Sequence, residues 1–189
     1  LMPDASPVTI ASAQREMRDA YLGGAPGVLV SATAWCIAGL VCLWRSPQQA
    51  VWALFIGGAL IHPLSVALLK LLKRPGTHAA NNPLGPLALS STLWMIMSLP
   101  LAWVASTVNA GWFFPAMLLV IGGRYLNFAT VYGMRLYWPF GAALALAAWA
   151  LVSAKASPAL GAFSGAAIEA GFGMALWFAQ RRRPAPVMP

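Results

Sequence analysis

Charged side chains are scarce in this sequence. Asp, Glu, Lys and Arg make up 8% of its 189 residues, and four of these residues are acids. A soluble domain carries about 25% charged residues. Hydrophobic residues account for 60% of the chain, and the mean hydropathy is +0.71. Such a chain could not cover its surface with polar groups, so the composition predicts an all-α, polytopic membrane protein with one compact domain.

Cysteine is also scarce, and the usual catalytic motifs are missing. Cys36 and Cys42 both lie in the first apolar segment, where a helix would point them in different directions. This argues against a disulfide or a metal site built on the pair. The sequence has no glycine-rich phosphate loop, no His/Cys metal spacing, no acid pair for Mg²⁺ and no nucleophile elbow. We therefore expect no cofactor, and no cleavable signal in residues 1–25.

Six apolar segments have about the length that crosses a membrane as a helix, which is about 20 residues. Turn sequences that contain proline or glycine separate them. The predicted spans are 27–44, 50–72, 84–108, 112–137, 139–154 and 159–179. Together they predict a six-helix transmembrane domain over residues 27–180. An N-terminal cytoplasmic or interfacial segment (1–26) precedes this domain, and a basic tail (181–189) follows it.

The N-terminal segment contains a short amphipathic pattern. Ile10, Ala13, Met17 and Tyr21 fall on one helical face, and charged residues fall elsewhere. This pattern predicts a helix that lies on the membrane surface.

Basic residues predict the orientation in the membrane. Nine of them lie on the side of the termini and two on the other side. The nine are Arg15, Arg18, Lys70, Lys73, Arg74, Arg135, Arg181, Arg182 and Arg183, and the two are Arg45 and Lys155. Because cytoplasmic loops carry the excess of Lys and Arg, both termini are expected in the cytoplasm, with the protein in the bacterial inner (plasma) membrane. The same bias explains the net charge of +8, so nucleic acid is not an expected partner.

A sequence pattern occurs twice, as IGGALIHPLSV (56–66) and IGGRYLNFATV (121–131). The preceding helices carry the related sequences SATAW (31–35) and SSTLW (90–94). A fainter third copy in the last span gives three glycines, each followed four residues later by a polar residue. The glycines are Gly58, Gly123 and Gly165, and the polar residues are His62, Asn127 and Glu169. We therefore predict three pseudo-repeated helix hairpins around a pseudo-threefold axis along the membrane normal; chance matches in an Ala/Leu/Gly-rich chain are the alternative.

Arg124 and Glu169 are the charged residues deep inside predicted spans. A charge at the bilayer centre costs about 2.5–3.5 kcal/mol on insertion scales, so such residues should pair or line water. We predict that Arg124 and Glu169 interact near the midplane. The predicted neighbours are His62, Asn127, Tyr125 and Tyr132. The alternative is a buried polar cluster that only fixes the order of the helices.

Trp35, Trp94 and Trp149 occupy corresponding places in the helices that precede the repeats. Core packing is the first expectation for these side chains, and the wall of a pore or pocket is the second. The polar loop residues His78, Asn81 and Asn82 are expected to be solvated.

The run FFPAMLLVIGGRYLNFATVYGMRLYW (113–138), with NNPLGPL (81–87), resembles an uncharacterised family of small bacterial six-span membrane proteins. That resemblance supplies no function. Through FIGGALI (55–61) and AAIEAG (166–171), the chain is also similar to proton-gated urea channels and amide transporters, which implies a narrow solute path between three hairpins. The basic bias places the termini inside, whereas this second likeness would place them outside, so no gating residue is transferred.

Three functional hypotheses follow. The first is a channel or transporter for a small polar solute, with a constriction at Arg124 and Glu169 and pH dependence through His62. The second is an intramembrane enzyme acting on a lipid or apolar substrate, with His62 and Glu169 as base and acid in a pocket walled by the three tryptophans. The third is a non-catalytic membrane scaffold. The expected partners are the lipid bilayer and a small polar solute, and a homo-oligomer is left open.

Overall fold

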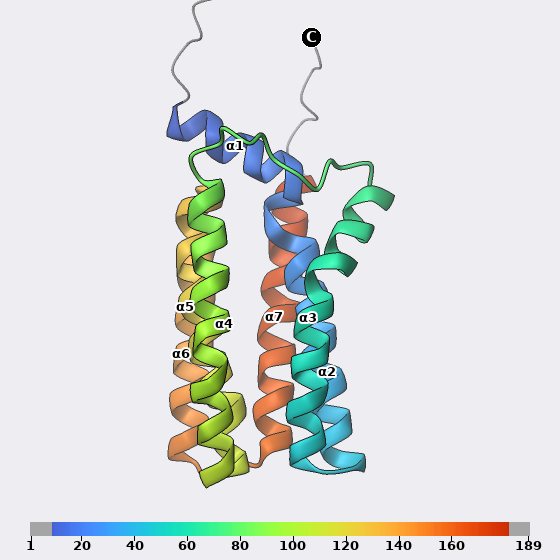
Figure 1. Cartoon of the computed structure of the whole chain (residues 1–189), viewed down its shortest axis with the longest axis vertical. Helices are drawn as coiled ribbons and strands as arrows, with labels where there is room; N and C mark the ends of the chain where they lie inside the picture. Colours follow the sequence, from blue (N-terminus) through green and yellow to red (C-terminus); the bar gives the residue numbers. More distant parts are fainter. Residues whose placement is uncertain (1–8, 182–189) are drawn as a thin grey trace, which may run out of the picture.

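The computed structural model describes residues 9–181, and the regular structure within this range is helical (Figure 1). Helix α1 (Ile10–Tyr21) lies across one end of a bundle of longer helices. The bundle helices are α2 (Ala25–Trp44), α3 (Pro47–Leu71), α4 (Gly85–Val108), α5 (Phe113–Tyr132), α6 (Tyr137–Ser153) and α7 (Pro158–Arg181). Short 3₁₀ turns, Leu22–Gly24 and Ala110–Trp112, precede α2 and α5. The all-α prediction is confirmed.

Five segments of the described chain are long and apolar enough to cross a membrane. They contain α2, α3, α4, α5 and α7, whereas α6 is a shorter apolar helix of 17 residues. The chain is therefore a polytopic membrane protein. The predicted basic tail lies outside the described residues except for Arg181, and so does the part of the N-terminal segment before Thr9.

The structure ends α5 at Tyr132, five residues before the predicted end at 137. Gly133 follows with a φ of 60°, a left-handed conformation that glycine adopts without steric cost and that stops the helix. The next helix, α6, begins at Tyr137, so Pro139 lies in its first turn, where a proline is tolerated. The other predicted span ends agree with the helices to within three residues.

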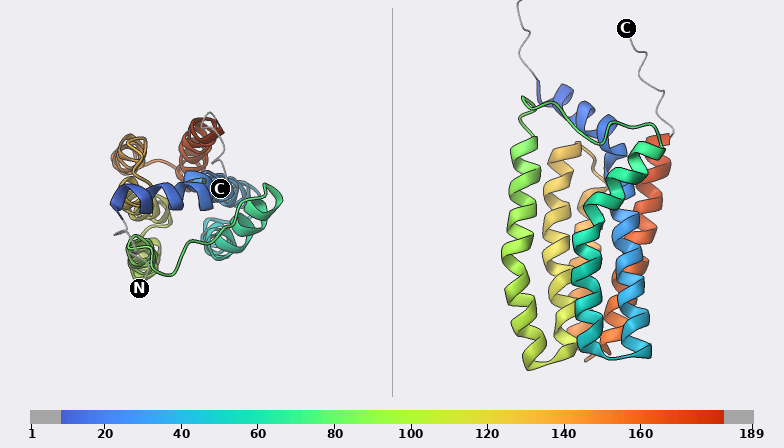
Figure 2. Two further views of the ribbon diagram at one scale, coloured as in Figure 1. Left: turned by 90° about the horizontal axis from the view of Figure 1, so that it is seen from above. Right: turned by 45° about the vertical axis from the view of Figure 1, so that its right-hand side comes forward.

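The bundle helices form two groups of three. α2 packs most extensively against α7 and α3, and α5 packs against α6 and α4. We call α2, α3 and α7 the first group and α4, α5 and α6 the second group; Figure 2 shows them side by side. Contacts between the groups are sparser and come mainly from α7 with α5 and α6. The arrangement differs from the three packed hairpins expected from the repeat, because α7 pairs with α2 rather than with α6.

A proline bends α3. Pro63 has no N–H to bond to the carbonyl of Ala59, and its ring crowds the preceding turn. Beyond this point α3 leans away from the bundle (Figure 1). His62 and Leu64, on either side of the proline, are exposed.

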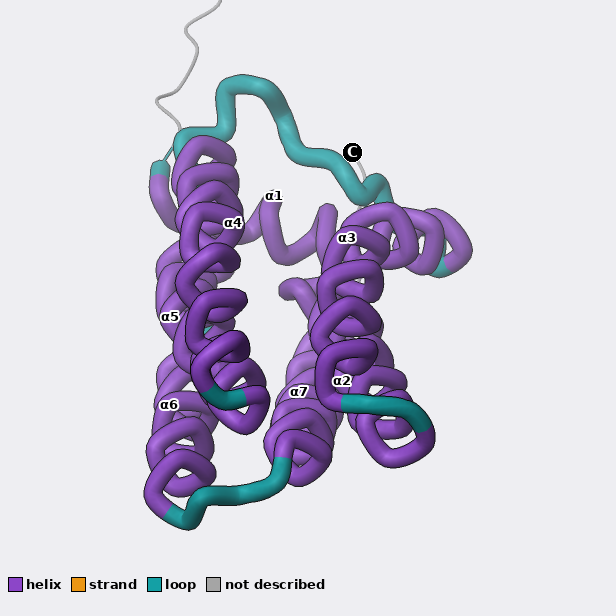
Figure 3. Tube along the Cα trace, turned by 60° about the horizontal axis from the view of Figure 1, so that its bottom comes forward, coloured by secondary structure: helices purple, strands orange, loops and turns teal. Residues whose placement is uncertain are grey.

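α1 and the α3–α4 loop (72–84) together cover the end of the bundle where the described chain begins and ends. Figure 3 shows this loop joining the two groups. Ala13, Met17 and Ala20 of α1 are buried, which confirms the amphipathic helix predicted from the sequence. The loop is also tied to α1 by a contact between Tyr21 Oη and His78 Nδ1 of 2.8 Å.

Asn82 corrects the expectation that the loop is solvated throughout. Its side chain is 3% exposed. Asn82 Nδ2 donates to the Ala13 carbonyl at 3.2 Å and to Glu16 Oε2 at 2.9 Å, while its Oδ1 accepts from the Leu84 N–H at 2.9 Å. Glu16 Oε1 also accepts a hydrogen bond from the Ala79 N–H. These bonds fix the loop to α1 because a buried amide must satisfy its donors and acceptor within the protein.

Candidate functional site

Glu169 lies midway along α7 and is fully buried. By sequence it is the one acid within the six bundle helices. Its surroundings come from both groups: α2 of the first group and α5 of the second. A buried carboxyl group in the middle of a membrane-spanning helix is costly and is usually kept for a function or a specific polar contact.

A stripe of glycines places Glu169 on the inner face of α7, which packs against α5 at Gly161 and against α2 at Gly165 and Gly173. Gly161, Gly165 and Gly173 share the four-residue spacing that keeps side chains on one helical face, and Glu169 falls in the same series. A Cβ atom added at Gly165 would lie 2.6 Å from the Trp35 ring. The two helices are therefore close enough for α2 side chains to reach the carboxyl group.

One carboxylate oxygen of Glu169 is hydrogen-bonded across the groups. Tyr125 Oη donates to Glu169 Oε1 at 3.0 Å. Ser31 and Trp35 of α2 interact with the same carboxyl group. Glu169 Oε2 and Trp35 Nε1, however, have no hydrogen-bond partner of ordinary geometry. The site thus holds a buried acceptor and a buried donor, neither of which completes an ordinary hydrogen bond.

Aromatic rings from several helices pack against the side chains that contact this polar centre. Tyr125 stacks on Phe140 with the ring centroids 4.1 Å apart, and Phe140 stacks on Phe172 at 4.6 Å. On the α2 side, the Trp35 ring lies 6.0 Å from that of Phe114. Tyr132, which was predicted to add a hydroxyl group, is buried and stacks on Tyr137 with a centroid separation of 5.7 Å. Tyr125 and Trp35, the aromatic neighbours of the carboxyl group, are therefore themselves packed against rings of α6 and α5.

Arg124 does not form the predicted ion pair with Glu169. Its guanidinium nitrogens donate to Thr92 Oγ1 at 3.1 Å and lie 3.4 Å from Met95 Sδ, both on α4. The guanidinium also lies over the Phe128 ring, 5.1 Å from its centroid. Because Arg124 faces α4 within the second group while Glu169 faces α2 and α5, its charge reaches the carboxylate only over a longer distance.

The remaining predicted residues lie apart from Glu169. His62 is exposed on α3, and Asn127 is half-buried with its Nδ2 bonded to the Gly123 carbonyl of its own helix at 3.3 Å. Trp94 is 61% exposed and Trp149 is 77% exposed, so neither packs in a core or a central wall. The structure brings together Glu169, Tyr125 and Trp35 from the predicted set and separates the others.

Sequence reasoning missed Ser31, Phe140 and Phe172. Ser31 begins the SATAW sequence four residues before Trp35, so its place on the face of Trp35 could have been read from the helical period. Phe140 gives no such signal, because its position depends on where α5 ends and α6 begins.

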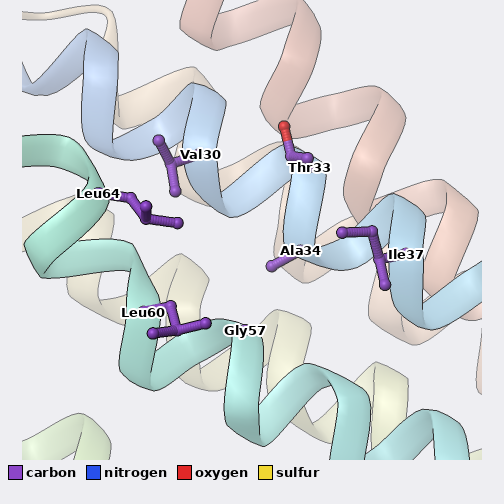
Figure 4. A pocket seen from close by; sticks show the side chains of 7 residues that line it. All are labelled: Val30, Thr33, Ala34, Ile37, Gly57, Leu60 and Leu64. Carbon is purple, nitrogen blue, oxygen red and sulfur yellow. The ribbon is translucent and has the colours of Figure 1, made fainter. Parts of the chain in front are cut away.

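An apolar groove opens on the surface between α2 and α3 (Figure 4). It encloses about 300 Å³, and its lining residues are Val30, Thr33, Ala34, Ile37, Gly57, Leu60 and Leu64. Neither His62 nor Glu169 lines it. The groove therefore offers a surface for an acyl chain but no acid or base.

The chemistry open to the site is proton exchange at Glu169 and recognition of hydrogen-bond donors or positive charge. Within residues 9–181 no cluster of three or more His, Cys, Asp or Glu side chains could hold a metal ion. The described side chains at the site itself, one carboxyl group with hydroxyl and indole groups, supply too few oxygens for a divalent cation.

The chain matches a known protein family. Residues 10–179 match a protein family described as a family of unknown function, DUF7010. Neither a curated protein nor a solved structure matches the chain.

Proposed function

The chain belongs to the DUF7010 family, whose function is unknown, and we propose from its site that it is a channel or transporter for a small polar solute. We place it in the bacterial inner membrane, with both termini in the cytoplasm. Glu169, with its neighbours Tyr125, Ser31 and Trp35, would bind the solute or the proton that drives it.

The observation that carries this proposal is the burial of Glu169. The side chain has no exposed surface, and one of its oxygens makes no hydrogen bond of ordinary geometry. A carboxylate left in this way costs several kcal/mol, so a role that only fixed helix order would be better served by a fully bonded or apolar residue. A carboxyl group that alternately binds and releases a proton or a ligand needs an oxygen that is not already fully hydrogen-bonded.

The arrangement of the helices favours a transporter that alternates between open and closed states, rather than a permanently open channel. Glu169 is enclosed where the two groups meet, and the Tyr125–Glu169 hydrogen bond joins them. Contacts between the groups are sparser than those within them. A rocking motion of one group against the other would expose the carboxyl group first to one side and then to the other. His62 does not enter this scheme, because it is exposed on α3.

Two features support the proposed orientation. Figure 1 shows the beginning of α1 and the end of α7 at the same end of the bundle. The described basic residues gather at this end, which has Arg15, Arg18, Lys70, Lys73, Arg74, Arg135 and Arg181, against Arg45 and Lys155 at the other. This is the distribution expected if that end faces the cytoplasm.

The enzyme hypothesis loses its acid–base pair in this arrangement. His62 lies on the outside of α3, whereas Glu169 is fully buried between α2, α5 and α7. The lateral groove between α2 and α3 has an apolar lining without a catalytic group. No specific contact favours the scaffold hypothesis, so transport remains the proposal.

The test is solute flux in vesicles that contain the purified full-length chain. Urea, glycerol and methylammonium are offered with and without a pH gradient, and their entry is followed by light scattering or by radiolabel uptake. We expect protein-dependent entry of at least one solute, and we expect Glu169→Gln to change it while Asp19→Asn does not. Asp19 is a matched acid-to-amide change in α1, outside the site. Absence of entry for every solute under both conditions would overturn the proposal.

A further inference from the structure

We propose, resting on the transport function above, that Glu169 binds a small organic ammonium ion, which competes with a proton for the carboxyl group. Both occupants satisfy the same requirement, because each neutralises the one acid of the bundle helices. One proton leaves the carboxyl group for each cation that binds, so the total charge of the site does not change. A protein with this site would exchange protons for cations across the membrane.

The first reason to expect a bound cation at Glu169 is charge balance. Glu169 has no exposed surface, and no ion pair joins it to a basic side chain in the described part of the chain. Buried charges in proteins are paired or are neutralised by a proton. Arg124, which could have paired with it, bonds to Thr92 on α4 instead. The position beside Glu169 Oε2 is therefore left for a cation that is not part of the chain.

The side chains around the carboxylate determine which kind of cation can bind. Alkali and alkaline-earth ions require several oxygen ligands, and Mg²⁺ and Ca²⁺ take six or more. Here the nearby side-chain oxygens beyond the carboxylate belong to Tyr125 and Ser31, and Tyr125 and Trp35 bring aromatic rings to the site. Ring faces attract organic cations, and this attraction is strongest in desolvated sites. A site with so few oxygens, and with the rings of Tyr125 and Trp35 beside it, therefore suits an alkylammonium ion better than a metal ion.

Trp35 further restricts the range of ligands that would fit the site. Its Nε1 is a buried donor that interacts with the Glu169 carboxyl group but makes no hydrogen bond of ordinary geometry. An ammonium group offers donors only, so it satisfies Glu169 Oε2 but not this N–H. An ammonium ion that also carries a hydroxyl oxygen satisfies both. Amino alcohols are therefore expected to bind more tightly than alkylammonium ions of the same size.

Binding of the cation would also change how the two groups of helices pack against each other. Glu169 belongs to the first group, and its bonded partner Tyr125 belongs to the second. A cation on Glu169 Oε2 would lie at the same junction and would alter the contact that holds the groups together. Occupancy by a proton or by a cation is thereby linked to the motion that transport requires.

The test measures binding and flux on the same protein. Binding of ethanolamine and ethylammonium to the full chain in detergent is followed by calorimetry at several pH values. We expect binding to weaken as the pH falls, because protons occupy Glu169, and ethanolamine to bind more tightly than ethylammonium. Glu169→Gln should weaken binding by more than about tenfold, because an amide cannot neutralise the cation. Asp19→Asn should leave it unchanged. Trp35→Phe, which keeps a ring, should remove the preference for ethanolamine.

The outcomes separate this proposal from the transport function. Entry of urea or glycerol into vesicles without ammonium binding overturns the proposal and leaves transport standing. Ammonium binding that depends on Glu169, with no flux of any solute, supports the proposal and contradicts transport. If Glu169→Gln does not fold, Glu169→Asp, which keeps the charge, is the second variant. Glu169→Asp shortens the side chain and so moves the carboxylate. If ammonium affinity and its pH dependence stay unaltered in this variant, the proposal is overturned.

Discussion

Tyr125 donates a 3.0 Å hydrogen bond to Glu169, and through this bond a residue of α5 is joined to a residue of α7. The two helices belong to different groups of three, which otherwise meet through sparser contacts than those inside each group. The bond therefore couples a buried carboxyl group directly to the packing of the two halves of the bundle.

Removing this bond should destabilise the junction. In Tyr125→Phe, Glu169 loses its bonded partner, and we expect the free energy of unfolding to fall by about 1–3 kcal/mol. Thermal unfolding in detergent measures the change. Tyr132→Phe is the control, since Tyr132 is also buried but its hydroxyl makes no hydrogen bond within the described residues. Equal stability of the two variants would contradict a specific role for the Tyr125–Glu169 bond.

The close approach of α7 to α2 should make Gly165 intolerant of a side chain. A Cβ at this position would lie 2.6 Å from the rigid indole ring of Trp35, so Gly165→Ala should cost about 1–3 kcal/mol of stability. Gly171→Ala, on the same helix, meets nothing within 4 Å and should be tolerated or slightly stabilising. Thermal unfolding of the two variants checks the expectation, and comparable destabilisation in both would count against the α2–α7 packing.

The cover formed by α1 and the α3–α4 loop should depend on Asn82. Asn82→Ala removes the bonds to Ala13 and Glu16, and we expect faster hydrogen exchange in both α1 and residues 72–84. The neighbouring Asn81 is exposed, so Asn81→Ala should leave exchange unchanged. Mass spectrometry of the exchanged peptides provides the measurement. Unchanged protection of α1 in Asn82→Ala would show that the loop does not hold this helix.

The proposed orientation can be tested with single cysteines. Cys36 and Cys42 are first replaced by serine, and Thr77→Cys and Ser157→Cys are then made separately at exposed positions on opposite ends of the bundle. In intact cells a membrane-impermeant maleimide should label the cysteine at 157 and reach the one at 77 only after the membrane is opened. The reverse pattern would place both termini outside.

Local sequence signals were sufficient to predict the helices. Apolar length and prolines at the turns gave the spans, and the amphipathic pattern gave α1. The one large error in a boundary is at the end of α5, where Gly133 stops the helix inside an aromatic run that looks continuous by composition. A left-handed glycine is a conformational choice of the backbone, and the hydropathy of its neighbours does not reveal it.

The site was predicted only in part, because helical periodicity fixes a face but not the neighbour of that face. Glu169 was correctly expected to be an interior charge, and Tyr125 to be near it. Arg124 was expected on the same site, but it is turned toward Thr92. The pairing of α7 with α2 depends on the fit of Trp35 against Gly165, residues far apart in the sequence. A repeat seen within the chain could not reveal that complementarity.

The position of α7 in the chain has a consequence for biosynthesis. α2 and α3 leave the ribosome early, and the whole second group follows before α7 is made. Until then, Trp35 and Ser31 have no helix to cover them, and the first group stays incomplete. Glu169 enters the bilayer after the second group, when Tyr125 is already in place to receive it, so the polar partner lowers the penalty of inserting the acid. A ribosome that stops before residue 158 would release a protein with this seam open to lipid.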